Sequence, residues 1–118
     1  MLVTINSVRF AIPLRTNIRH AYCYKFRTSD RETDSATGID YSKAVVISKD
    51  SYLGETTDIN DKEYLELQQK TFFILNKFKK YVNDYINYKK HGGNEYVAKR
   101  YVFSTLKYFD DILLNVED

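Results

Sequence analysis

An apolar strand runs into a loop of hydrogen-bond donors in the segment Phe10-Ala-Ile-Pro-Leu-Arg-Thr-Asn-Ile-Arg-His20. Residues 10–14 predict a buried strand, and Pro13 fits only near its end or at a sheet edge, because proline cannot donate to the ladder. The polar side chains that follow are Arg15, Thr16, Asn17, Arg19 and His20. A loop held by a rigid strand can aim such donors at a phosphate. An ordinary solvated turn fits this segment equally well.

The composition predicts a globular, soluble protein with one domain over residues 1–118. The chain is 43% hydrophobic and 29% charged, and its length is sufficient for an independent core. No apolar run is long enough to span a bilayer, and the chain starts with a strand-like segment instead of a signal peptide. The single cysteine, Cys23, excludes an intramolecular disulfide and fits a reducing cytoplasm.

Two histidines and one cysteine, far apart in sequence, do not form a zinc-binding pattern. A magnesium ion held by carboxylates stays open at this point. We expect no cofactor and no membrane partner.

The formal net charge of +2 hides a segregation of charge along the chain. Residues 1–30 contain five Lys and Arg against one acid, residues 31–66 four against nine, and residues 67–118 nine against six. Such a pattern is consistent with a basic face for a polyanion and an acidic face elsewhere.

The first half of the chain predicts strands. Alternating or β-branched runs occupy residues 2–5, 8–14, 21–26, 43–47 and 52–59. Asn6-Ser7 is typical of a tight hairpin turn, and we expect residues 43–47 to form the central strand. Residues 27–38 contain almost no apolar side chains and predict a long loop.

The second half predicts helices. Asn60 with Glu63 three residues later forms a capping box, and apolar residues then recur at helical spacing up to Tyr85. Gly92-Gly93 ends this helix, a short helix follows near residues 94–100, and Ser104 caps a final helix. The order predicts an α+β fold: a small curled antiparallel sheet with a long helix and a C-terminal helix packed on it.

Three motifs follow one another within residues 8–114. They are Ile12-Pro-Leu-Arg-Thr-Asn-Ile-Arg-His20, Gly38-Ile-Asp-Tyr-Ser-Lys-Ala-Val-Val-Ile47 and Phe103-Ser-Thr-Leu-Lys-Tyr-Phe109. In order and spacing they resemble the toxins of type III toxin–antitoxin systems, most closely the CptN and TenpN branches and more distantly ToxN and AbiQ. Members of that family usually carry an N-terminal segment and a complete first strand before the hairpin, whereas Met1 starts inside that strand. The resemblance therefore implies a shortened homologue or a truncated reading frame, and it does not imply full activity.

The resemblance also implies a fold and a function. The fold is a MazF/Kid-like small β-barrel with added helices. The function is that of a metal-independent endoribonuclease in phage defence by abortive infection, which cuts cellular or phage RNA. A small repeated, pseudoknot-like antitoxin RNA inhibits the toxin, which cuts that RNA from a precursor and joins it in a cyclic RNA–protein assembly.

Metal-free RNA cleavage uses the neighbouring 2′-hydroxyl as nucleophile, and it needs a base, an acid and donors to the phosphoryl oxygens. Arg15 and Arg19 are candidate donors, and Thr16 and Asn17 can bond the phosphate. His20 is a candidate base or acid, because histidine is the side chain that most often transfers protons in catalysis. The alternative for His20 is a half-buried ring that satisfies a backbone carbonyl.

Ser42 and Lys43 form a second candidate catalytic pair at the start of a predicted strand. Lys43 can stabilise phosphoryl charge, and Ser42 can bond a phosphate or a base. The alternative is an Asp40–Lys43 ion pair at the surface, which contributes little.

Aromatic and basic residues are candidates for RNA binding. Tyr22, Tyr24 and Tyr41 can stack unpaired bases. We expect the phenylalanines Phe72, Phe73, Phe78 and Phe109 to be core. The cations that can line an antitoxin groove are Lys77, Lys79, Lys80, Lys89, Lys90, Lys99 and Arg100, each of which also fits a solvated helix face.

Three functions therefore remain open. The first is the endoribonuclease toxin, and the second is a catalytically inactive RNA-binding module with the same fold. The third is a protein-interaction domain that binds its partner through the aromatic-rich helix.

Overall fold

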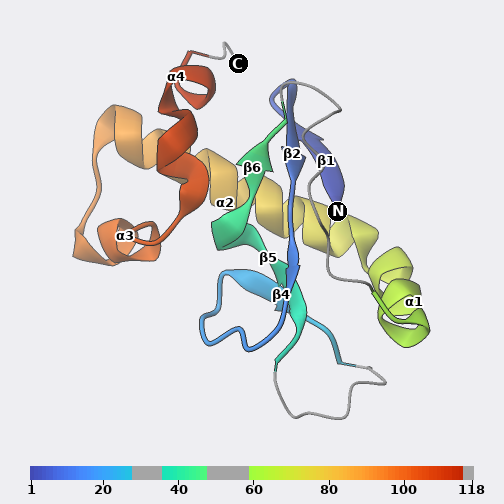
Figure 1. Cartoon of the computed structure of the whole chain (residues 1–118). Coiled ribbons are helices and arrows are strands. Elements are labelled where there is room, and N and C mark those ends of the chain that lie inside the picture. The colour runs from blue at the N-terminus through green and yellow to red at the C-terminus, as the bar shows by residue number, and fades with distance from the viewer. Residues whose placement is uncertain (28–35, 48–58, 116–118) are drawn as a thin grey trace.

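The computed structural model describes residues 1–27, 36–47 and 59–115, and its fold is α+β (Figure 1). The strands are β1 (Leu2–Ile5), β2 (Val8–Ala11), β3 (Leu14–Arg15), β4 (Cys23–Lys25), β5 (Gly38–Asp40) and β6 (Val45–Val46). The α-helices are α1 (Asp61–Gln69), α2 (Thr71–His91), α3 (Glu95–Arg100) and α4 (Asp110–Leu113). The 3-10 turns of the described residues are η1 (Tyr41–Lys43) and η3 (Thr105–Phe109). The predicted strand 52–59 lies outside the described residues except for its last position.

The first sheet has the strand order β1-β2-β6, with both pairs antiparallel. The predicted hairpin is confirmed: Asn6 and Ser7 have φ angles of 52° and 64°, which is the backbone of a two-residue turn that follows the strand twist. The prediction of residues 43–47 as the central strand was wrong, because β2 is the central strand among the described residues and β6 pairs with β2 alone there. The chain around Lys43 instead forms η1, which Asp40 caps by accepting a hydrogen bond from the Ser42 N–H.

The second sheet has the order β3-β5-β4, also antiparallel. Gly38 is required in β5, because a Cβ atom there would lie 1.9 Å from the carbonyl oxygen of Tyr24. The expected single curled sheet is not found among the described residues. Two connections join the two sheets, and neither continues as a strand. Pro13, between β2 and β3, has no N–H for the hydrogen-bond ladder, and the 3-10 turn η1 interrupts the chain between β5 and β6.

The helices begin and end largely where the caps predict. Asn60 and Glu63 form the capping box of α1, and Gly92 ends α2 with a φ of 80°. The predicted long helix is divided at Lys70, whose φ and ψ are −106° and 11°. Ser104 caps η3, so the predicted C-terminal helix starts as a 3-10 turn and becomes α-helical at Asp110.

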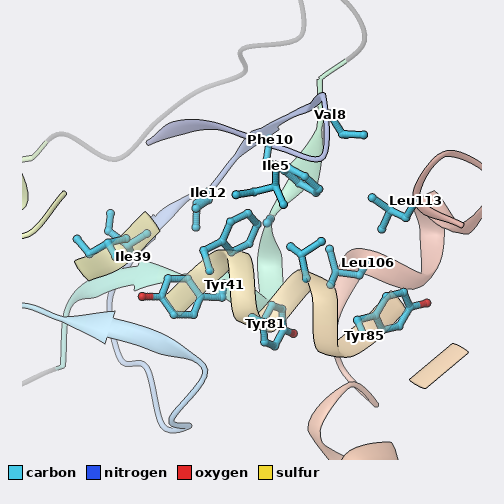
Figure 2. Packing of buried hydrophobic residues seen from close by; sticks show 14 of the residues in the cluster. Ile5, Val8, Phe10, Ile12, Ile39, Tyr41, Tyr81, Tyr85, Leu106 and Leu113 are labelled. Carbon is cyan, nitrogen blue, oxygen red and sulfur yellow. The ribbon is translucent and has the colours of Figure 1, made fainter. Parts of the chain in front are cut away.

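Helix α2 crosses behind the strands, with α1 at one end and the segment α3–α4 at the other (Figure 1). The buried cluster between them includes Ile5, Phe10, Ile12, Ile39, Ile74, Phe78, Val82, Leu106 and Leu113 (Figure 2). The rings of Phe10 and Phe78 meet edge to face with centroids 5.2 Å apart. Full burial of a side chain of this size contributes about 1.5–3 kcal/mol.

Tyrosine hydroxyls fasten α2 to the C-terminal segment. Tyr81 donates to Ser104 Oγ at 2.8 Å, Tyr101 donates to the Tyr81 carbonyl at 2.8 Å, and Tyr85 donates to Asp110. These bonds let large amphipathic rings fill the core without leaving a hydroxyl unsatisfied. In the part of the chain that the structure describes, no helix has the length and hydrophobicity of a membrane span.

The expected core phenylalanines divide into two groups. Phe78 is fully buried and Phe109 is half-buried against the core, as predicted. Phe72 and Phe73 were wrongly predicted as core, because 81% and 50% of their surfaces are exposed at the start of α2. Phe73 has a place in the candidate site instead.

Candidate functional site

A groove with a volume of about 400 Å³ lies between the start of β4, helix α2 and the end of α3. Its lining residues are Ala21, Tyr22, Cys23, Tyr41, Phe73, Lys77, Lys80, Tyr81, Asp84 and Arg100. This is the size of a small-molecule or single-nucleotide site, and the lining combines aromatic rings with cations. We refer to these ten residues as the basic groove.

One face of α2 supplies half of the basic groove. Phe73, Lys77, Lys80, Tyr81 and Asp84 follow one another at spacings of three, four and one residues along the helix. Side chains three and four positions apart lie on the same helix face, so this spacing aligns them in one stripe. Arg100 joins them because the short α3 returns the chain to the side of α2.

The three cations of the basic groove have different partners. Lys80 Nζ lies 2.7 Å from Asp84 Oδ2, and Arg100 Nη1 lies 3.4 Å from the same oxygen. Lys77 Nζ lies 5.6 Å from the centroid of the Phe73 ring, in cation–π contact. Three cations against one carboxylate leave excess positive charge, which favours an anion such as a phosphate.

The aromatic rings of the basic groove differ in burial. Tyr41 and Tyr81 are buried. Because burial raises the pKa of both phenols well above the usual value, both side chains stay neutral. Tyr22 is half-buried between His20 and Tyr81, with ring centroids 5.7 Å and 6.2 Å away. Tyr22 and Phe73 are therefore the rings that a ligand can reach.

Tyr24 does not belong to the basic groove, contrary to the prediction that it stacks bases. The side chain of Tyr24 lies in the core, and its hydroxyl donates a hydrogen bond to the buried carboxylate of Glu66. Its ring edges meet Phe26 and Phe73. No open ring face remains for a base.

His20, Asp40 and Ser42 form a hydrogen-bonded cluster beside the groove. His20 Nδ1 accepts the Tyr22 N–H at 3.0 Å, so the other ring nitrogen, Nε2, carries the proton and lies 3.2 Å from Asp40 Oδ1. Ser42 Oγ donates to Asp40 Oδ1 at 2.6 Å. Both His20 nitrogens thus have partners inside the protein, and the ring holds Tyr22 in the groove wall.

The polar loop leads into this cluster. Arg15 ends β3, Asn17 has a φ of 57°, and the buried Ile18 fixes the loop by donating its N–H to the Ala36 carbonyl at 3.0 Å. The side chains of Arg15, Thr16, Asn17 and Arg19 are exposed and make no hydrogen bond or ion pair with other described residues. They are available to a ligand.

Lys43 lies apart from the His20 cluster. Its Nζ donates to the carbonyl of Phe103 at 3.2 Å, which connects η1 to the C-terminal segment. The alternative of an Asp40–Lys43 surface pair was also wrong, because Asp40 is buried and bonds His20 and Ser42.

The structure brings together half of the predicted RNA-binding residues in the basic groove: Tyr22, Tyr41, Lys77, Lys80 and Arg100. Four of the lysines predicted to bind RNA are exposed but do not line it: Lys79, Lys89, Lys90 and Lys99. Lys89 forms an ion pair with Asp110, with Nζ 3.5 Å from Oδ2.

Six residues of the site were not predicted from the sequence: Asp40 and the groove residues Ala21, Cys23, Phe73, Tyr81 and Asp84. Asp84 stands four positions after Lys80 and Phe73 four positions before Lys77, and these spacings are typical of helix-surface pairs. Asp40 gave no comparable signal, because its partner His20 is twenty residues away in sequence.

Comparisons with protein-family models, curated proteins and solved structures give no match to this chain. Within residues 1–27, 36–47 and 59–115, no group of three or more His, Cys, Asp or Glu side chains is arranged to hold a metal ion.

Proposed function

We propose that this protein is a metal-independent endoribonuclease of the type III toxin–antitoxin kind, which binds single-stranded RNA in the basic groove and acts in the cytoplasm. The observation that carries the proposal is the combination in one groove of two accessible rings, Tyr22 and Phe73, with the cations Lys77, Lys80 and Arg100. Unpaired RNA is held by base stacking and phosphate contacts. The MazF/Kid-like relationship of the fold belongs to this proposal and rests on the motif resemblance alone.

The polar loop supplies the proposed chemistry. The substrate 2′-hydroxyl loses its proton to a base and forms a bond to phosphorus, while the bond to the 5′-oxygen breaks and that oxygen takes a proton. The products are a 2′,3′-cyclic phosphate and a 5′-hydroxyl. In this proposal Arg15 and Arg19 stabilise the charge on the phosphoryl oxygens, with Thr16 and Asn17 as further donors.

His20 and Ser42 are positioning residues in this proposal. Because Nδ1 accepts the Tyr22 N–H and Nε2 faces Asp40, His20 exchanges a proton with substrate only after one of these contacts breaks. Lys43 is left out of the chemistry because it bonds the Phe103 carbonyl. The proposed partners are a small repeated antitoxin RNA, processed by the protein itself, and cellular or phage RNA as substrate.

Total RNA incubated with the purified protein in EDTA tests the proposal. Cleavage should continue and leave cyclic phosphate and 5′-hydroxyl ends. Arg15→Ala and Thr16→Ala should each lower the rate on the order of a hundredfold, since each removes one donor to the developing charge. Arg27→Ala is the matched control, because it removes an exposed arginine outside the loop and groove. Activity only with magnesium, 5′-phosphate ends, or full activity of both loop variants would contradict the mechanism.

A catalytically inactive RNA-binding module is the second candidate. It is favoured by the engagement of both His20 nitrogens and by the Ser42 hydroxyl donating to Asp40, which leaves neither group free to act as a base. The same experiment separates the candidates: this protein would bind RNA without producing new ends.

A further inference from the structure

We infer that Asp84 recognises the base that enters the basic groove and favours a base with an amino group, such as cytosine, over uracil. This inference rests on the proposed RNA binding and adds the selectivity of the same site.

The two oxygens of the Asp84 carboxylate differ in their contacts. Lys80 and Arg100 both approach Oδ2, at 2.7 Å and 3.4 Å. Oδ1 makes no hydrogen bond with any residue that the structure describes. Because Asp84 lines the groove and a third of its side chain is exposed, it offers a charged acceptor whose orientation two cations restrict.

The dimensions of the groove favour a single unpaired base. A volume of about 400 Å³ is in the range of small-ligand sites and is sufficient for one nucleotide. The exposed ring of Phe73 offers a surface for stacking, Tyr22 offers its ring edge, and Lys77 over the Phe73 ring supplies a cation for a phosphate. An unstacked base keeps its hydrogen-bonding edge free, so a fixed acceptor in the groove can distinguish one base from another.

Cytosine and uracil differ at the group that a carboxylate contacts. The cytosine N4 amino group donates to Asp or Glu, whereas uracil carries an O4 acceptor at that position, which repels a carboxylate. The two bases have the same ring size, and oligonucleotides of the two bases with equal length carry the same phosphate charge. A difference in their affinity therefore measures recognition of the edge, separately from stacking and phosphate binding.

Asp84 also neutralises two of the groove cations, which gives its substitution a distinctive result. Asp84→Ala removes the acceptor and releases Lys80 and Arg100 to bind phosphates. Affinity for RNA should rise while the preference for cytosine disappears. Asp84→Asn keeps the shape and adds an amide donor that can bond uracil O4, so it should also remove or reverse the preference.

The test uses fluorescence anisotropy with short oligocytidylate and oligouridylate. Both carry 2′-O-methyl groups, which block the nucleophile and keep cleavage from obscuring binding. The wild-type protein should prefer oligocytidylate roughly tenfold, the value of one hydrogen bond to a charged group. Asp84→Ala should bind oligouridylate more tightly than wild type and show no preference. Asp111→Asn, an equal charge change at an exposed site in α4, should keep the wild-type ratio.

Equal binding of the two oligonucleotides by the wild type, or a cytosine preference that survives in Asp84→Ala, would overturn the inference and leave the proposed RNA binding intact. Failure of the wild type to bind either oligonucleotide would overturn the inference and the proposed function together. Competition of free cytidine monophosphate with the labelled oligocytidylate tests whether the ligand is an RNA strand. Weak competition supports an RNA strand as the ligand. Competition as strong as that of the unlabelled oligonucleotide would show that the site binds a free nucleotide equally well and would contradict an RNA strand as the ligand.

Discussion

A single buried carboxylate, Asp40, determines how the polar loop ends. It accepts hydrogen bonds from the Ser42 N–H and hydroxyl and lies within 3.2 Å of His20 Nε2. His20 in turn accepts the Tyr22 N–H, so the contacts run from the capped turn η1 to a wall of the basic groove. The sequence named His20 and Ser42 as candidate site residues, and the structure brings these two together at Asp40. It could not predict Asp40 as their partner, because strand pairing between β4 and β5 creates that contact.

Cys23 should be an unreactive thiol although it lines the basic groove. Burial, the main cause, raises its pKa from 9.0 to about 11, and nearby Lys25 opposes this only partly. At pH 8 the thiolate fraction is then lower by about a hundredfold, and alkylation by iodoacetamide should slow in proportion. The same chain unfolded in urea is the control and should react at the rate of an ordinary cysteine. Equal rates in the folded and unfolded protein would contradict the buried environment.

At the scale of secondary structure, local signals predicted most element boundaries. The Asn6-Ser7 turn, the Asn60–Glu63 capping box and the Gly92 helix end all depend on residues close together in sequence. The sequence did not predict the break at Lys70 or the place of β6 beside β2. The pairing of β6 with β2 joins residues far apart in sequence, which a local pattern of apolar residues does not encode.

The hairpin turn gives a prediction about stability. Ser7 is exposed and has a φ of 64°, a conformation that is strained for a residue with a Cβ atom. Ser7→Gly should stabilise the protein by up to about 1 kcal/mol, because Asn-Gly is the preferred pair for this turn. Ser7→Ala is the matched control and should be no more stable than wild type. Urea denaturation measures both, and a less stable Ser7→Gly variant would contradict the turn geometry.

For the whole molecule, convergence of distant segments creates the site. Lys77 and Lys80 meet Arg100 only because α3 returns to α2, whereas their neighbours Lys79 and Lys99 point elsewhere. The sequence alone could list these cations but could not separate them, because each has the same local pattern. Buried tyrosines hold the same segments together through their hydroxyls.

These tyrosines should make the fold sensitive to alkali. Burial raises the pKa of Tyr24 and Tyr101 to about 12, and it raises those of Tyr41, Tyr81 and Tyr85 further. In the unfolded chain these phenols ionise near pH 10, so the unfolded state loses protons first and the free energy of unfolding falls as pH rises above about 10.

Urea denaturation across this pH range measures the effect. Tyr101→Phe should be less stable than wild type at neutral pH, because it loses the bond to the Tyr81 carbonyl, but its stability should fall less steeply above about pH 10. Tyr96→Phe, at an exposed tyrosine, should keep the wild-type slope. A slope unchanged in Tyr101→Phe would contradict the proposed role of its buried phenol.

The affinity of single-stranded RNA for two double variants tests the central claim most directly. Lys77→Ala with Arg100→Ala removes two cations from the basic groove, and Lys79→Ala with Lys99→Ala removes two exposed lysines outside it. Titrations over a range of salt concentrations should show weaker binding by the groove variant. The slope of log affinity against log salt concentration should be shallower by about 1.4 for the groove variant, whereas the slope of the control variant should stay close to that of the wild type. Equal losses in both variants, or no loss in either, would contradict RNA binding in the basic groove.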